Sequence, residues 1–179
     1  MRIWRICSAC LAVVLFVCAN ATAQEWETGK AGITMGYPAA VGFIWHIADS
    51  VAIRPEFTFS TSGFDGSVST DTTNLSTGVS ALFYLASHDH VRGYLSPRFT
   101  YTRGSTQSSS GDRPAGSFTS NTYGIIGSVG VQYAPIRKFS VFAEVGAGYT
   151  RSTESFDVRL DITSHGSGMR TGVGIIFYP

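Results

Sequence analysis

The sequence has little charge, almost no lysine and no cysteine beyond its first 18 residues. Charged residues make up 14% of the chain, against about 25% in a typical soluble domain. A disordered chain would be rich in charge and poor in aromatics, whereas 13% of these residues are aromatic. The formal net charge of +1, without any basic cluster, excludes the electrostatic footprint of a nucleic-acid binder. The length of 179 residues suits one domain.

Long apolar runs are also scarce, and the clearest one lies at the N-terminus. Arg2 and Arg5 precede an apolar run at residues 11–17, and Ala21 and Ala23 supply the small residues of a cleavage site. This order is typical of a secretory signal peptide, here residues 1–23, and the run is too short for a spanning helix. Its removal takes away all three cysteines, so residues 24–179 can form no disulfide and no cysteine-ligated metal site. We expect those residues to form a single domain.

Helical periodicity is absent after the leader, and the recurring pattern has a period of two. Between residues 139 and 150 the odd positions are all apolar, while the even positions are mainly small or polar. The same alternation predicts eight strands, near residues 30–37, 40–48, 51–61, 74–85, 92–103, 121–134, 139–151 and 166–178. Long connections rich in Ser, Thr and Gly, at 62–73, 104–120 and 152–165, are predicted to be solvated loops. Pro55 and Pro97 fall inside strands, where a missing N–H predicts a bulge or a strand start.

The composition of the two strand faces separates a membrane barrel from a soluble sandwich. A sandwich would carry many Lys and Glu on its outer face, but only Lys30 and Lys138 follow the leader. Gly, Ser and Thr suit a narrow barrel interior, with the apolar face toward lipid. Nine aromatic residues of odd number fall at the two ends of the strands, as in the girdles of a membrane barrel. They are Tyr37, Tyr101, Tyr123 and Tyr149 at the long-loop end, and Trp45, Phe83, Tyr133, Phe139 and Phe177 at the short-turn end.

A sheet that spans a membrane must close on itself, because unpaired backbone groups are costly in lipid. The sequence therefore predicts an all-β fold, an eight-stranded antiparallel up-and-down transmembrane β-barrel. The leader, the eight strands, the segment Val141–Tyr149 and the final aromatic strand resemble the small outer-membrane β-barrel family of the OmpA/OmpX type. The resemblance covers residues 25–179. It implies export to the outer membrane of a Gram-negative cell, contacts with outer-membrane lipid, lipopolysaccharide and the assembly machinery, a monomeric state and no cofactor.

Five charged residues share the parity of the barrel interior: Arg54, Glu56, Arg98, Glu144 and Arg170. An isolated charge in a narrow, low-dielectric interior is very costly, so these side chains are expected to pair. Arg98 is the first expected partner of Glu144, and Arg170 is the second. Because eight strands enclose a lumen just wide enough for side chains, a structural plug is favoured over an ion pathway.

His165 and Ser167 are the weak candidates for catalysis. They resemble the His-x-Ser pair of the lipid A deacylase family, in which a Ser–His pair can activate a hydroxyl. That family has an Asn after the Ser and a downstream Glu, whereas here Gly168 follows the Ser and no Glu follows Glu154. The four histidines bring no third metal ligand close in sequence, so no metal site is expected.

The leading functional hypothesis is therefore a non-catalytic outer-membrane barrel whose exposed loops serve envelope integrity, adhesion or another surface interaction. Two alternatives stay open: a lipid A-modifying hydrolase of the outer leaflet, and a narrow porin-like pore.

Overall fold

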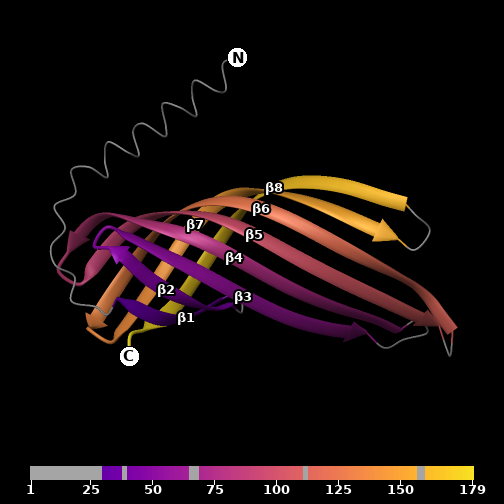
Figure 1. Cartoon of the computed structure of the whole chain (residues 1–179), viewed down its shortest axis with the longest axis horizontal. Coiled ribbons are helices and arrows are strands. Elements are labelled where there is room, and N and C mark those ends of the chain that lie inside the picture. The colour runs from indigo at the N-terminus through magenta and orange to yellow at the C-terminus, as the bar shows by residue number, and fades with distance from the viewer. Residues whose placement is uncertain (1–29, 38–39, 65–68, 111–112, 157–159) are drawn as a thin grey trace, which may run out of the picture.

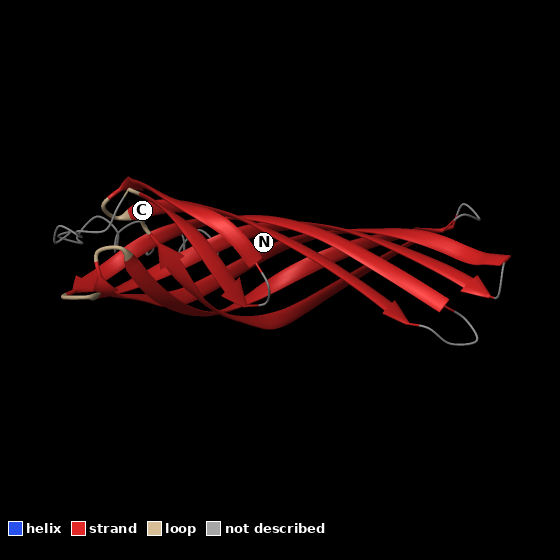
Figure 2. Ribbon diagram, turned by 90° about the horizontal axis from the view of Figure 1, so that it is seen from below, coloured by secondary structure: helices blue, strands red, loops and turns tan. Residues whose placement is uncertain are grey.

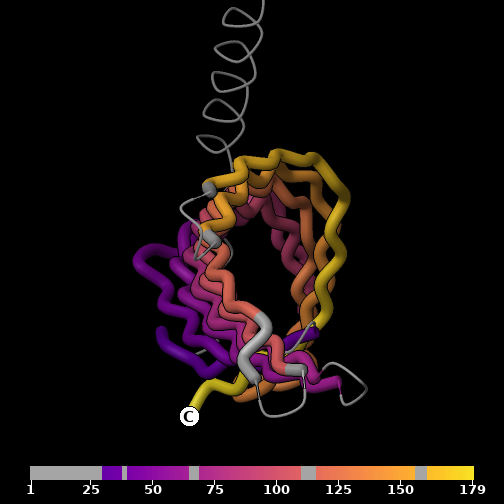
Figure 3. The backbone as a smooth tube through the Cα atoms, turned by 90° about the vertical axis from the view of Figure 1, so that its right-hand side faces the viewer, coloured from indigo at the N-terminus to yellow at the C-terminus, as the bar shows by residue number. Residues whose placement is uncertain are grey.

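The computed structural model describes residues 30–37, 40–64, 69–110, 113–156 and 160–179, nearly all of them in β-strands (Figure 1). The strands are β1 (Ala31–Tyr37), β2 (Ala40–Ala48), β3 (Val51–Phe64), β4 (Ser69–His88), β5 (Val91–Ser110), β6 (Arg113–Ile136), β7 (Phe139–Phe156) and β8 (Leu160–Phe177). Each strand pairs antiparallel with the next, and β1 pairs with β8, which closes the barrel (Figures 2 and 3). The predicted eight-stranded antiparallel barrel is confirmed. The predicted signal peptide lies outside the described residues, among which no helix is long and apolar enough to cross a membrane.

The two faces of the barrel follow the alternation in the sequence. Exposed large apolar side chains lie outside and carry odd numbers, apart from Phe64, Ile136 and Ile162 among the described residues. Ile136 follows a β-bulge after Tyr133, which reverses the parity locally. The buried apolar residues of even number point inward and form the core of the lumen, among them Ile44, Leu82, Ile126, Phe142 and Ile176. The interior is thus filled by side chains, as expected for eight strands.

The long connections predicted as loops are instead extensions of the strands, so this prediction is wrong. β3 continues to Phe64, β5 to Ser110 and β7 to Phe156, each returning through a short connection. Hydroxyl pairs link the strands there, for example Thr72 to Thr106 with 3.1 Å between the oxygens, and Thr70 to Ser108 at 3.4 Å. β-Branched threonine favours the extended backbone, and cross-strand hydroxyl pairs stabilise the ladder. A segment rich in Ser and Thr therefore forms paired strands once its neighbour is in register.

The prolines inside strands also differ from the prediction, because neither causes a bulge or a strand start. Pro55 stays in register with Val79, and Pro97 with Gly127. Each instead interrupts one ladder: the β2–β3 register skips the Pro55 position, and the β4–β5 register skips the Pro97 position. In an antiparallel sheet the N–H of each residue serves only one neighbour. The missing donor therefore costs pairing on one side and leaves the register unchanged.

The first hairpin is much shorter than the other three, which makes the barrel wall uneven (Figure 1). β1 ends at Tyr37, opposite Val173 of β8, and the last residue of β3 paired with β2 is Phe57. In the described part of the chain, residues 58–64 of β3 and 160–172 of β8 therefore have a neighbour on one side only. Beyond the first hairpin, the wall is a six-stranded sheet with two free edges.

Gly146 provides a test of how tightly the lumen is packed. A Cβ at this position would meet the carbonyl oxygen of Gly127 and lie 2.8 Å from Cα of Ser128, and backbone cannot move aside. We expect Gly146→Ala to lower the free energy of unfolding by about 1–3 kcal/mol, as overpacking does. Urea unfolding in detergent micelles, followed by the gel shift between folded and boiled protein, measures it.

Gly168→Ala is the matched control, because Gly168 has the same inward parity and a Cβ there would meet nothing within 4 Å. Equal stability of the two variants would show that the packing around Gly146 is loose.

Candidate functional site

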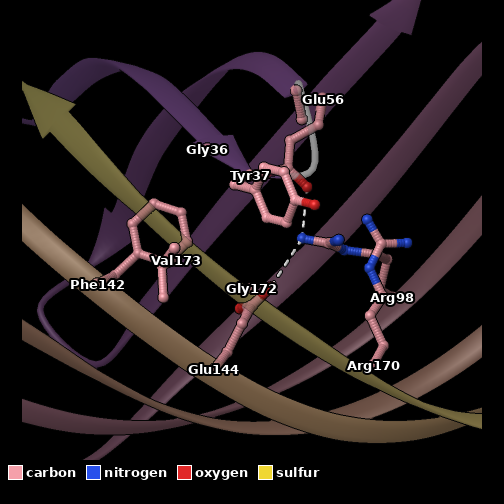
Figure 4. Close-up of a pocket in the computed structure, with 10 residues that line it drawn as sticks. Gly36, Tyr37, Glu56, Arg98, Phe142, Glu144, Arg170, Gly172 and Val173 are labelled. Carbon is pink, nitrogen blue, oxygen red and sulfur yellow. Dashed lines mark hydrogen bonds and ion pairs between the residues drawn. The ribbon is translucent and has the colours of Figure 1, made fainter.

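A layer of buried charges crosses the middle of the lumen, and we call Arg54, Glu56, Arg98 and Glu144 the charged layer. Arg54 donates two hydrogen bonds across the barrel from β3 to Glu144 of β7, at 2.8 and 3.0 Å. Arg98 of β5 donates to the same carboxylate at 3.1 Å and also forms an ion pair with Glu56 (Figure 4). A longer contact of 3.5 Å joins Arg54 to Glu56. Two carboxylates, from β3 and from β7 across the barrel, thus bridge the guanidinium groups of β3 and β5.

The surroundings of the charged layer satisfy much of its remaining polarity. Arg54 is fully buried, and the other three side chains are almost as inaccessible. Ser80 accepts a hydrogen bond of 2.7 Å from Nε of Arg98, and the Tyr94 hydroxyl donates to Glu144 at 3.3 Å. The ring of Phe142 lies 4.6 Å from the guanidinium carbon of Arg54. Charges buried this deeply are tolerated only when they are paired and hydrogen-bonded.

The structure brings together four of the five charged residues that parity selected, and Arg98 pairs with Glu144 as predicted, but the second pairing differs from the prediction. Glu144 pairs with both Arg54 and Arg98, and Arg54 makes the shorter contact. Arg170, the second partner expected for Glu144, forms no ion pair with any described residue. It lines the same pocket as Glu56, Arg98 and Glu144, beside Arg98 (Figure 4). The correction has a physical reason: the Arg54–Glu144 bond spans the lumen between strands far apart in the sheet, which parity and depth along a strand do not specify.

A second polar layer closes the lumen on the side of the short turns, and sequence reasoning missed it. Gln132 donates to the Tyr178 hydroxyl at 3.2 Å and accepts from Tyr84 at 2.8 Å. His46 lies 3.1 Å from the same Tyr178 hydroxyl, and the Arg92 guanidinium stacks 4.0 Å over the Tyr84 ring. The signal for this layer was the even number of four of these residues and of Arg92, which places all of them inside. Both layers consist of packed side chains that cross the lumen, at two different depths.

The nine aromatic residues predicted as girdles have the outward position that their parity implies. Six are exposed: Tyr37, Trp45, Tyr123, Tyr133, Tyr149 and Phe177. The remaining three, Phe83, Tyr101 and Phe139, are half-buried against their neighbours. Phe139 lies opposite Phe177 at the short-turn end, and the rings of Tyr101 and Tyr123 are 5.1 Å apart toward the other end. The exposed apolar side chains between these two levels form a band around the barrel.

The weak catalytic pair, His165 and Ser167, lies on the outer face of β8, where both residues are exposed. The His165 ring is 6.3 Å from the ring of Tyr149 and has no hydrogen bond to Ser167 or to a carboxylate within the described residues. A base without an orienting group is a poor activator of a hydroxyl. In the same part of the chain, no three His, Cys, Asp or Glu side chains are grouped as metal ligands would be. The geometry therefore supports a packed barrel interior more than a reaction centre.

The charged layer makes a prediction about paired charges. Glu144→Ala leaves Arg54 and Arg98 with only Glu56 to balance them, and loss of one member of a buried pair costs about 3–5 kcal/mol. Combining it with Arg54→Met leaves the Arg98–Glu56 pair intact, so we expect the double change to cost less than the sum of the single changes. Urea unfolding of the refolded variants measures these free energies.

Glu154→Ala is the control on the same strand, because Glu154 is half-buried near the outer end of β7 and we expect a change within about 0.5 kcal/mol there. Strict additivity of the Arg54 and Glu144 changes would contradict a coupled layer.

Comparison with known proteins bears on the fold. No protein-family model and no curated protein matches the chain. Among solved structures, a major outer membrane protein from Thermus thermophilus aligns with a TM-score of 0.57 and 14% identity, over 83% of this chain and 99% of that one. Ail, the attachment invasion locus protein of Yersinia pestis, aligns with a TM-score of 0.51 and 14% identity, over 84% and 98%. The chain therefore has the fold of small outer membrane β-barrel proteins.

Proposed function

We propose that the chain is an integral outer-membrane protein that is held in lipid by the apolar band around its barrel. The observation that carries this proposal is a closed barrel whose polar and charged groups face inward while its large apolar side chains are exposed outside. A soluble protein rarely exposes a continuous apolar surface of this size. At the level of the first hairpin the closed ring pairs every strand with both of its neighbours, as a sheet in lipid requires. We further propose that residues 1–23 direct export, and that lipid, lipopolysaccharide and the assembly machinery are the partners of a monomer.

The long hairpins then face the outside of the cell, and the two-residue turns face the periplasm, as in other barrels of this architecture. The outer ends of β3 to β8 are polar, with Ser, Thr and Gly on both faces. We propose a non-catalytic role for them in surface interaction or envelope integrity. An attachment protein shares the fold, and stiff hairpins present polar side chains at a fixed distance from the membrane.

The two alternatives have less support. A narrow pore needs a continuous wet path, but the charged layer and the Tyr84–Gln132–Tyr178 layer both cross the lumen. A lipid-modifying hydrolase needs an oriented base, and His165 has no carboxylate partner in the described part of the chain.

The apolar band is tested by a charge at its middle. Val145 lies mid-strand on β7 with its side chain outside, and an arginine at the bilayer midplane costs about 2–4 kcal/mol. We expect Val145→Arg to reduce stability by this amount in vesicles. Thr153→Arg, eight residues along the same face and near the outer end of the strand, should change it little. Equal tolerance of both arginines, or recovery of the wild type as a soluble periplasmic protein, would rule out the membrane location.

The role of the hairpins is tested by shortening the β5–β6 hairpin. Replacing residues 105–118 with a two-residue turn removes only its polar outer part and leaves the charged layer and the apolar band in place. We expect the shortened protein to keep its gel shift in outer-membrane fractions, while cells that produce it lose adhesion to surfaces coated with extracellular-matrix protein. Cells with an empty vector set the baseline. If wild-type cells adhere no better than the empty-vector cells, the adhesion role is ruled out. If cells with the shortened protein are as sensitive to detergent as wild-type cells, the role of this hairpin in envelope integrity is ruled out.

A further inference from the structure

The short first hairpin leaves a lateral opening in the barrel wall. The first hairpin reaches only as far as Tyr37, the last residue of β1, and Ala40, the first residue of β2. Its neighbours β3 and β8 continue beyond this point with free edges on this side. A pocket lies where the hairpin ends. Residues from the hairpin, β3, β5, β7 and β8 line it, and the carboxylates of Glu56 and Glu144 lie at its inner end (Figure 4). The opening therefore connects the side of the barrel with the charged layer.

The inner end of this opening carries an excess positive charge. Among the described residues, two carboxylates there, those of Glu56 and Glu144, face three arginines: Arg98 and Arg170 line the pocket, and the buried Arg54 pairs with both carboxylates. Both carboxylates are engaged by Arg54 and Arg98, and Arg170 is half-buried without an ion-pair partner among the described residues. The positive charges of Arg98 and Arg170 also repel each other, because the two side chains are neighbours (Figure 4). An anion beside Arg170 would relieve this repulsion and would find charge-assisted hydrogen-bond donors.

The outer rim of the opening is apolar. Tyr37 at the end of the hairpin, Phe59 on the free part of β3 and Met169 on the free part of β8 are 77%, 68% and 82% exposed. These side chains are among the most exposed apolar ones of the described chain. An apolar rim outside a cationic pocket matches a molecule with an anionic head and a hydrocarbon tail. The head would lie in the pocket, and the tail would lie against the rim.

We propose that this opening binds an anionic amphiphile from the surrounding membrane, with Arg170 as the binding residue for its phosphate or carboxylate group. The headgroup enters between β3 and β8 above the first hairpin, and the acyl chain stays in lipid against the apolar rim. This proposal rests on the membrane location proposed above. A lipid-borne ligand fits better than a free anion, because the tail gains apolar contact at the rim while the head replaces its lost hydration with a guanidinium.

The test measures binding of lysophosphatidic acid, which has one acyl chain and one phosphate, to the refolded full-length barrel in micelles of an uncharged detergent. Native mass spectrometry gives the stoichiometry, and calorimetric titration gives the affinity. We expect one molecule per barrel, binding at least about tenfold weaker for Arg170→Gln, the factor that one charge-assisted hydrogen bond supplies, and partial retention for Arg170→Lys. Arg151→Gln, an exposed arginine outside the pocket, should bind as the wild type does.

Three results would overturn the proposal. If wild type and Arg170→Gln bind lysophosphatidic acid with equal affinity, Arg170 is not part of the site. If zwitterionic lysophosphatidylcholine binds the wild type equally well, the site does not require an anion. Inorganic phosphate that binds as tightly as the lipid would remove the lateral route. The gel shift of each variant reports folding separately, and the Val145→Arg comparison in vesicles tests the membrane location separately. A failed amphiphile site is thereby distinguished from a failed membrane assignment.

Discussion

The narrow width of the lumen is the constraint on which the rest of this structure depends. Eight strands leave room for side chains and little else, so each inward group must fit and must find a partner. This explains why Arg54, which is fully buried, reaches across the barrel to Glu144, since a charge at that depth is tolerated only with a partner. It also explains the inward glycine at Gly146, where even a methyl group would meet the backbone of β6.

The uneven wall is the second determinant of what the barrel can do. Its lower part is a complete ring, closed by β1 and β2, and holds both layers of polar side chains. Its outer part is an open sheet of six strands, linked by hydroxyl pairs. Paired strands rather than loops therefore make up most of this outer part. Arg170 lies beside the charged layer, at the step between the two parts of the wall, and has no carboxylate partner among the described residues.

The sequence allowed the strand cores, the barrel and the inward side of each strand to be predicted, because parity is a local property with a period of two. It did not allow the outer hairpins to be recognised, since Ser and Thr are common in loops and form a ladder only when the opposite strand supplies a partner such as Thr106 for Thr72. The members of the charged layer followed from parity and depth. Their partners followed only in part: Arg98 was the expected partner of Glu144, whereas the contact from Arg54 to Glu144 depends on the curvature of the whole sheet. The even number of Tyr178 indicated an inward side chain, but its central position in the second layer depends on contacts with Gln132 and His46 that parity does not specify.

The claim that the lumen is filled and locked by paired charges is tested most directly by the ion permeability of vesicles that contain the folded wild-type protein. The gel shift before and after boiling establishes insertion in the same preparation. The account predicts that these vesicles leak ions no faster than protein-free vesicles, and that planar bilayers show no sustained conductance. Permeability that rises in proportion to the amount of inserted protein would contradict it and would mean that the lumen is open.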